Sequence, residues 1–262
     1  MTISAPVAAV QLNPNEIRFY NEEGYLVLPG VVSREVAAQL AEEVLELMAA
    51  SGTSLDELRN LAGARGKLMN SHQYLAGSAL DSTINSPQLK AIASGLMGGD
   101  STLYLPFSAV KAGGGGGTFH FHQDNQYTRF DGPGINLWMA LSPMSPGNGC
   151  LMVVPRSHLG GTEEAISPDG DGHRAVAQDP TRFLPVRMNP DDVIAFSRLT
   201  IHGSGPNHTG EPRLAYAVQF HRDDVNAIWD GQEPRLLKET PRWNTAPAEQ
   251  LTPPDAKGRD GH

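Results

Sequence analysis

Two segments in the N-terminal third of the chain carry apolar residues at every third or fourth position, which is the spacing of an amphipathic helix. The first helix should begin after Ser33, a residue type that caps helix N-termini, and should run to about Ala50; its inward positions are Val36, Leu40, Val44, Leu45 and Met48. The second should open at Ser86-Pro87 and end at Gly98-Gly99; its inward positions are Leu89, Ile92, Ala93 and Leu96.

Beyond Asp100 the apolar residues occur in short runs separated by turn-forming residues, which indicates β-strands. The runs that predict strands span residues 103–110, 117–124, 135–141, 150–155, 193–197 and 214–221. Helices that come first and antiparallel strands that follow favour a mainly β fold with flanking α-helices, in which a barrel or sandwich is backed by the N-terminal helices.

The length of 262 residues fits one large domain with a substantial core, and 28 glycines and 20 prolines agree with many turns between short strands. We expect a single domain over residues 1–243, with the helices in residues 1–100 and the barrel in residues 101–225. Residues 244–262 are rich in proline and charge, and they are expected to form a flexible C-terminal tail.

The formal net charge of −9 argues against nucleic acid or an anionic membrane as a partner. The single cysteine, Cys150, allows no internal disulfide, which fits a reducing compartment. The sequence shows no secretory signal and no apolar run near the roughly 20 residues that a membrane span needs. These features predict a soluble cytoplasmic protein, and they leave its oligomeric state open.

The predicted strand that ends at residue 124 carries the strongest chemical signal. Side chains alternate between the faces of a strand, so His122 and Asp124 should point the same way. His202, at the end of a later strand, can complete a set of two histidines and one carboxylate. Such a trio is the facial triad of non-haem iron oxygenases, and zinc hydrolases use the same ligand types. His120 shares the face of His122 and would be the ligand in a slipped register.

Three stretches of the sequence together resemble the phytanoyl-CoA dioxygenase family. They are His122-Gln123-Asp124, the segment from Asn148 to His158 with the sequence NGCLMVVPRSH, and His202-Gly203-Ser204 followed by Arg213. The family includes ectoine hydroxylase and contains Fe(II)- and 2-oxoglutarate-dependent oxygenases. The resemblance, which extends from about residue 17 to residue 221, implies a double-stranded β-helix (a jelly-roll or cupin-like barrel) that uses Fe(II), 2-oxoglutarate and O2.

The resemblance also implies roles for individual residues. His122, Asp124 and His202 would be the catalytic iron ligands. Arg213 would hold the distal carboxylate of 2-oxoglutarate, because a planar guanidinium can donate two hydrogen bonds to one carboxylate, and the hydroxyl group of Ser204 would help. The other cosubstrate-binding residues implied by the resemblance are Trp138, for which a plain core position is the alternative, and Lys67.

Residues directly after the first two ligands should leave the strand toward the open mouth of the barrel, where substrate enters. The residues of this segment predicted to contact substrate are Asn125, Gln126 and Arg129, and His72 is predicted to approach it from the N-terminal part of the chain. Because these side chains are polar, the sequence favours a small polar metabolite as the substrate. The alternative is that they are ordinary polar residues at the barrel mouth.

The function that the sequence favours is Fe(II)- and 2-oxoglutarate-dependent hydroxylation with release of succinate and CO2. The resemblance favours hydroxylation because Asp124 supplies a carboxylate where related halogenases have a small residue. Two alternatives stay open at this point. One is a metal-dependent hydrolase or isomerase on the same fold, and the other is a non-catalytic barrel that binds a metabolite.

Overall fold

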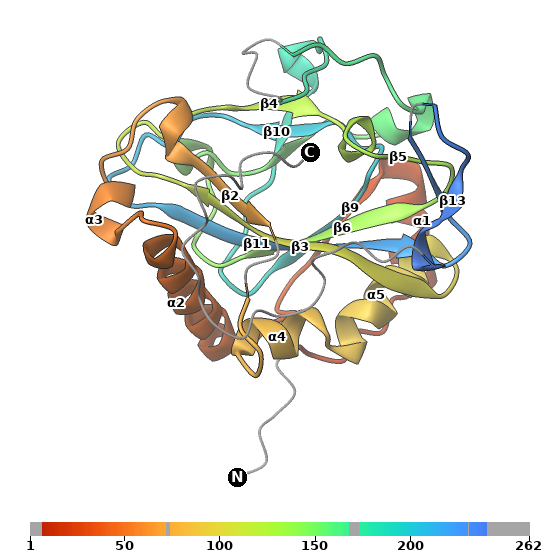
Figure 1. The fold of residues 1–262 in the computed structure, drawn as a ribbon, viewed down its shortest axis with the longest axis horizontal. Coiled ribbons are helices and arrows are strands. Elements are labelled where there is room, and N and C mark those ends of the chain that lie inside the picture. Colours follow the sequence, from red (N-terminus) through yellow and green to blue (C-terminus); the bar gives the residue numbers. More distant parts are fainter. Residues whose placement is uncertain (1–6, 72–73, 168–172, 230, 240–262) are drawn as a thin grey trace.

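The computed structural model describes residues 7–71, 74–167, 173–229 and 231–239 (Figure 1). The α-helices are α1 Pro14–Glu23, α2 Arg34–Ala50, α3 Leu55–Leu58, α4 Ala79–Ile84 and α5 Pro87–Met97. The strands are β1 Tyr25–Leu28, β2 Lys67–Ser71, β3 Ser101–Lys111, β4 Phe119–His122, β5 Arg129–Phe130, β6 Gly134–Ala140, β7 Met152–Val153, β8 Leu184–Pro185, β9 Val193–Ser197, β10 His202–Ser204, β11 Arg213–Arg222, β12 Asn226–Ile228 and β13 Arg235–Leu236. The 3-10 helices are η1 Ala64–Gly66, η2 Asp124–Gln126, η3 Pro146–Asn148, η4 Ser157–Gly160, η5 Pro180–Arg182 and η6 Leu237–Glu239.

Six strands form one antiparallel sheet in the order β1-β9-β6-β11-β3-β2. β11 pairs along its whole length with β3 and along most of its length with β6. Both edge strands, β1 and β2, come from the N-terminal part of the chain. The sheet therefore combines strands from the two regions that the sequence pattern separated.

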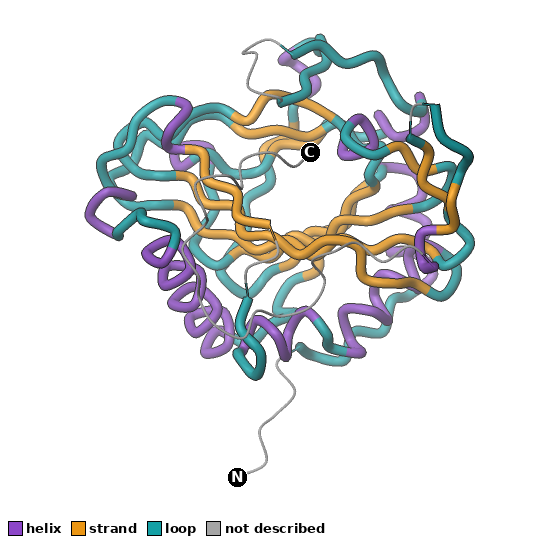
Figure 2. Tube along the Cα trace, viewed as in Figure 1, coloured by secondary structure: helices purple, strands orange, loops and turns teal. Residues whose placement is uncertain are grey.

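A smaller antiparallel sheet, with the strand order β4-β10-β7-β8, faces the six-stranded sheet (Figure 2). β10 pairs with β4 on one side and with β7 on the other. A third sheet, of order β13-β12-β5, lies beside these two. Buried side chains that fill the space between the two facing sheets include Phe107, Trp138, Val153, Ile194 and Phe196.

Helices α2, α4 and α5 lie along the outer face of the six-stranded sheet (Figure 1). Because side chains alternate along β11, Leu214 and Tyr216 point outward into the core shared with the helices, whereas Ala215 and Ala217 point inward. Both faces of the strand are thus covered, and its buried residues form a nearly continuous apolar run. The helical layer makes the six-stranded sheet a rigid support for the groups on its inner face.

The structure confirms both long helices at the ends that their capping residues predict. The hydroxyl group of Ser33 accepts a hydrogen bond at the start of α2, and that of Ser86 does so at the start of α5. α5 ends at Gly98, whose positive φ of 69° is a backbone conformation that glycine adopts readily. No helix among the residues in the structure is long and apolar enough to cross a membrane. The predicted tail, residues 244–262, lies outside the described residues.

Two predicted strands are shorter than the sequence indicated. The strand predicted over residues 117–124 is β4, which ends at His122, because Asp124 begins η2. The strand predicted over residues 150–155 is reduced to β7, since the backbone N–H of Cys150 donates to Ser145 in a turn instead of joining a ladder. The sheets also extend past the predicted barrel limits, through β1 and β2 before residue 101 and β12 and β13 after residue 225.

Candidate metal centre

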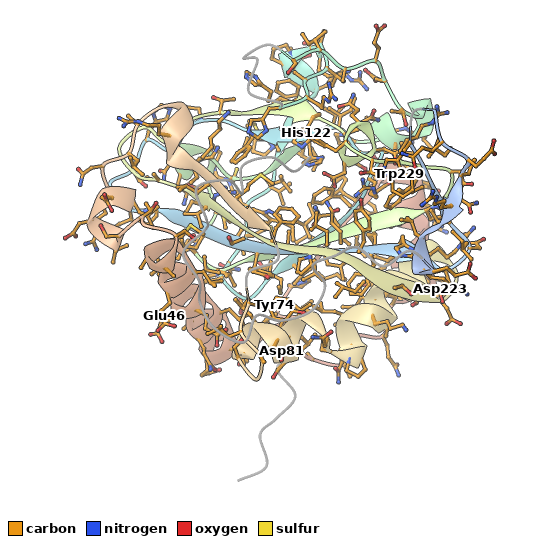
Figure 3. The ribbon with its side chains drawn as sticks, viewed as in Figure 1. Glu46, Tyr74, Asp81, His122, Asp223 and Trp229 are labelled. Atoms are coloured by element: carbon orange, nitrogen blue, oxygen red, sulfur yellow. The ribbon has the colours of Figure 1, made fainter. Side chains whose placement is uncertain are left out.

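His122 and His202 are directly opposite each other on the neighbouring antiparallel strands β4 and β10. Residues that are opposite in an antiparallel pair point to the same face of the sheet, so the two imidazoles come together. Their ring centroids are 4.4 Å apart. Figure 3 shows His122 on the β4 side of the space between the two facing sheets.

Both imidazole rings are oriented by the same kind of contact. Nδ1 of His122 donates to the backbone carbonyl of His120 at 2.7 Å, and Nδ1 of His202 donates to the carbonyl of Thr200 at 2.9 Å. A ring that carries its proton on Nδ1 keeps the lone pair on Nε2, which is the usual arrangement of a metal-binding histidine. Burial and the neighbouring His202 lower the pKa of His122 to about 4, so this ring is neutral at neutral pH.

Asp124 brings a carboxylate to the two imidazoles from a 3-10 turn and not from the strand. Its Oδ1 lies 3.7 Å from Nε2 of His202, and one ligand atom from each member of the trio lies within 4.8 Å of the others. Asp124 and His202 are buried, and His122 is partly buried. The inference that strand alternation aligns His122 with Asp124 was wrong in its mechanism, because the chain leaves the strand at Gln123.

The chemistry of these three side chains fits a divalent transition metal. Two imidazoles and one carboxylate are the donor set of non-haem iron sites, and three ligands on one side of an ion leave positions for other molecules. His120 contributes its backbone carbonyl to the orientation of His122 and is not among the three grouped ligand residues. The register with His202 thus favours His122 over the slipped alternative.

Three basic residues form a row across the inner face of the six-stranded sheet. Lys111 of β3 is the register partner of both Lys67 on β2 and Arg213 on β11. The ammonium groups of Lys67 and Lys111 lie 5.7 Å and 5.3 Å from the ring centroid of Phe119. This row places the guanidinium charge of Arg213 next to two lysine side chains at one end of the space between the sheets.

Arg213 is buried without a partner for one of its donors. Its side chain is 2% exposed, and its Nε has no hydrogen-bond acceptor in the structure. Its guanidinium group lies 5.2 Å from the Trp138 ring, and burial lowers the pKa of Arg213 to about 10. Uncompensated buried donors are costly. A bound carboxylate would satisfy this one, so the site fits an acidic ligand.

Small side chains occupy the strand positions next to Arg213. Ala215 follows Arg213 by two positions on the same face of β11, and it is the register partner of Ala140 on β6 and of Ala109 on β3. Ala217 comes next along the same face and is opposite Trp138. The inner face of the sheet next to Arg213 therefore carries short side chains at these register positions.

Lys111 joins the row of basic residues to the smaller sheet. Its Nζ donates to the hydroxyl oxygen of Ser204 at 2.6 Å and also contacts the backbone carbonyls of Ser204 and Gly205. It is fully buried, and burial together with the positive charges of Arg213 and Lys67 lowers the pKa of Lys111 to about 6. The contact fixes the chain two residues after His202.

The structure places the predicted substrate-binding residues in different surroundings. The amide of Asn125 bonds to Thr162 and to the backbone of Phe130, and it is buried. The amide of Gln126 bonds to the backbone of Gln123 and Glu163. Arg129 is exposed on β5, and His72 lies outside the described residues. The contacts of Asn125 and Gln126 give these two residues a structural role, and a direct contact of any of the four with substrate stays a prediction.

The sequence predicted no role at the metal centre for several residues around the trio. The Asp124 carboxylate accepts hydrogen bonds from Gln219 and Asn136. The ring of Tyr127 lies edge-on to His122 at 5.6 Å, and its hydroxyl oxygen accepts from the backbone N–H of Arg174. Lys111 had one available signal, a lysine at the inward position of a buried strand. The others depend on contacts between distant segments, and no local pattern marks them.

Comparison with known proteins shows the family of this chain and several of its relatives. Residues 20–215 match the model of the family described as phytanoyl-CoA dioxygenase (PhyH). Methylphosphonate hydroxylase from Gimesia maris is 27% identical over 223 residues, which are 84% of this chain and 83% of that protein. Dioxygenase lolE1 from Epichloe uncinata is 26% identical over 227 residues, which are 81% of this chain and 84% of that protein.

Solved structures share the fold. EvdO2 from Micromonospora carbonacea var. aurantiaca, complexed with 2-oxoglutarate, superposes with a TM-score of 0.69 at 21% identity, and the match covers 87% of this chain and 97% of that chain. This likeness confirms the predicted double-stranded β-helix. The two facing antiparallel sheets are the two halves of a jelly-roll barrel.

Proposed function

The chain belongs to the phytanoyl-CoA dioxygenase family, and from this premise we propose that it hydroxylates a small polar metabolite with Fe(II), 2-oxoglutarate and O2. It is a 2-oxoglutarate-dependent non-haem iron dioxygenase. The observation that carries the assignment is the meeting of His122, Asp124 and His202, whose ligand atoms lie within 4.8 Å of one another. The buried, incompletely paired Arg213 supports the acidic cosubstrate.

In this proposal the two imidazoles and the carboxylate hold the iron. Nε2 of His122 and of His202 would bind the metal because each Nδ1 is engaged by a backbone carbonyl. The Asp124 carboxylate would bind through Oδ1, the oxygen nearer to His202. The neutral state of His122 means that no proton has to leave this ring before the metal binds at neutral pH.

Arg213 would receive the distal carboxylate of 2-oxoglutarate, and Ser204 would add a hydroxyl group at the same end. Lys111 keeps Ser204 in place through the hydrogen bond between its Nζ and the Ser204 hydroxyl oxygen, and it is the register partner of Arg213. Trp138, opposite Ala217 on β6, forms a flat apolar wall beside the guanidinium. Lys67, partly buried on the edge strand β2, would face the acid from the other side of Lys111.

When bound together, iron, 2-oxoglutarate and O2 supply the oxidising chemistry, which converts 2-oxoglutarate to succinate and CO2 and inserts one oxygen atom into a C–H bond of the substrate. The chain itself positions the reactants and excludes water. Phe196 packs against His202 at 4.5 Å between ring centroids, and Phe107 and Trp138 are buried in the same space. These rings make the surroundings of the metal largely apolar.

We infer a polar substrate from the polar groups that lie near the His122 ring. Tyr127 lies against that ring, and His173 is close enough to contribute to the lowered pKa of His122. Methylphosphonate hydroxylase, one of the relatives, acts by its name on a small polar molecule. Hydroxylation is favoured because Asp124 supplies a third protein ligand to the metal.

Succinate formation tests the proposal. The purified protein should release succinate only when Fe(II), 2-oxoglutarate and O2 are all present, and a small polar metabolite that is the substrate should stimulate the release. His202→Ala should abolish it, whereas His208→Ala, in an exposed turn six residues later, should leave it unchanged. Succinate release that persists without iron or in His202→Ala would refute the proposal.

A further inference from the structure

We propose that Gln219 is a positioning residue for the metal-binding carboxylate. Arg198 orients its amide, and the amide holds Oδ2 of Asp124 so that Oδ1 stays directed at Nε2 of His202. The inference rests on the proposed function, because it assigns a role toward the metal that Asp124 would bind. It concerns side chains from β11 and from the turn after β9, neither of which is a metal ligand.

The first observation is that Oδ2 of Asp124 is already occupied. Nε2 of Gln219 donates to it at 3.0 Å, and Nδ2 of Asn136 donates to it at 3.4 Å. Gln219 and Asn136 are register partners on β11 and β6, so the rigid six-stranded sheet presents both amides side by side. Oδ1, by contrast, lies 3.7 Å from Nε2 of His202. Oδ2 of Asp124 therefore accepts hydrogen bonds from the sheet, whereas Oδ1 faces the imidazole of His202.

The second observation fixes which way the Gln219 amide faces. Nη1 of Arg198 donates to Oε1 of Gln219 at 2.7 Å. A guanidinium can only donate hydrogen bonds, so the amide atom next to it must be the oxygen, and the NH2 group must face Asp124. Gln219 is 4% exposed and Arg198 is 3% exposed, so water does not compete for either contact.

Arg198 is itself firmly held. Its Nη2 donates to the backbone carbonyls of Asp124 and Thr128, at 2.9 Å and 3.2 Å, and its guanidinium carbon lies 4.1 Å from the centroid of the Phe130 ring. A Cβ on Gly134 would overlap Cδ of Arg198, so the stem of the arginine fills the space that this glycine leaves. One side chain thus holds both the backbone of Asp124 and the amide that contacts its carboxylate.

A change in the ladder of β11 accompanies this arrangement. The pairing of β11 with β3 shifts register between Gln219 and Phe220. Such irregularities bend a strand and redirect a side chain, and they occur often next to active sites. Here the shift falls at the residue that reaches Asp124.

Gln219→Met tests the positioning role. The substitution keeps the length of the side chain and removes the donor to Oδ2 of Asp124, and it places no second carboxylate against that oxygen. Removal of such outer contacts typically weakens metal binding about 10- to 100-fold. We expect the dissociation constant for Mn(II), a redox-inert probe measured by calorimetry, to rise by that factor. A single cooperative urea transition of the metal-free variant shows that it is folded.

Gln232→Met is the matched control, because it makes the same substitution at an exposed position. Its Mn(II) dissociation constant should stay within about twofold of wild type, as for a surface substitution. If Gln219→Met does not fold cooperatively, Gln219→Leu decides the question, since it removes the same donor, and it should weaken Mn(II) binding at least about tenfold.

An unchanged or lower dissociation constant in the folded Gln219 variant would overturn the positioning role. Other outcomes would contradict the proposed function itself. They are a wild-type protein that binds no stoichiometric Mn(II), or an Asp124→Ala variant that binds Mn(II) as well as wild type does. Wild-type binding that Asp124→Ala abolishes and Gln219→Met leaves intact would refute only the positioning role.

Discussion

Arg213→Met should make the metal-free protein more stable while it weakens binding of 2-oxoglutarate. Arg213 is 2% exposed, its Nε has no acceptor, and burial lowers its pKa from 12.5 to about 10. The lowered pKa means that the folded protein holds this charge at a cost on the order of 3 kcal/mol at neutral pH. Methionine removes that cost and keeps a side chain of similar length.

Two smaller effects oppose the gain. The contact between the guanidinium and Trp138, at 5.2 Å, contributes about 1 kcal/mol, and altered packing costs about as much again. The net expectation is a metal-free protein about 1 kcal/mol more stable than wild type. Cosubstrate binding should change far more, because two charge-assisted hydrogen bonds of about 1.5–3 kcal/mol each are lost, which corresponds to about 10²- to 10⁴-fold weaker binding.

Two measurements on the same preparation check this prediction. Urea unfolding of the metal-free protein gives the free energy of unfolding, and anaerobic calorimetry of the Mn(II)-loaded protein gives the dissociation constant for 2-oxoglutarate. Arg213→Lys is the control, since it retains a positive charge without the planar fork and should fall between wild type and Arg213→Met in affinity. Affinity of Arg213→Met within about threefold of wild type would refute the assigned role, because that change is below the contribution of one such hydrogen bond.

The other predictions concern the groups around the site. Lys111 has a folded pKa of about 6 against 10.5, so the unfolded chain holds the extra proton between these values and wild-type stability should rise with pH there, by at most about 1.4 kcal/mol per pH unit. Lys111→Met should lack this rise in urea unfolding at pH 6.5 and 8.5 (about two units apart), and equal pH dependence of the two proteins would contradict the reasoning. Ser204→Ala should raise the 2-oxoglutarate dissociation constant about 3- to 10-fold, as for the loss of one neutral hydrogen bond. An unchanged dissociation constant in calorimetry would show that the Ser204 hydroxyl group does not contact the cosubstrate. Gly134→Ala, whose Cβ would overlap Cδ of Arg198, should cost about 1–3 kcal/mol in urea unfolding, and wild-type stability would show that Arg198 can move aside.

Much of the fold was predictable because its signals are local. Ser33 and Ser86 cap their helices through their own hydroxyl groups, and the apolar spacing that follows each cap sets the buried face. β9 has the predicted limits because a short apolar run bounded by turn residues has few other arrangements. The membership of β1 and β2 in the six-stranded sheet was not predictable in the same way, because it depends on pairing with strands far along the chain.

At the site, too, some features could be predicted from the sequence and others depend on contacts between distant segments. The trio of His122, Asp124 and His202 could be named from residue types and family resemblance, and the structure brings the three together. The turn at Asp124 could not, because Arg198, more than seventy positions later, binds its carbonyl. Gln219 gave no signal either, since an inward glutamine near the end of an apolar strand acquires a role only through the side chains it contacts.

The most direct test of the account is an anaerobic crystal structure of the protein with Mn(II) and 2-oxoglutarate. We predict one metal ion bound by Nε2 of His122, Nε2 of His202 and a carboxylate oxygen of Asp124, and 2-oxoglutarate bound to that ion with its distal carboxylate on the guanidinium group of Arg213. A metal bound elsewhere, or a cosubstrate whose distal carboxylate makes no contact with Arg213, would contradict the account.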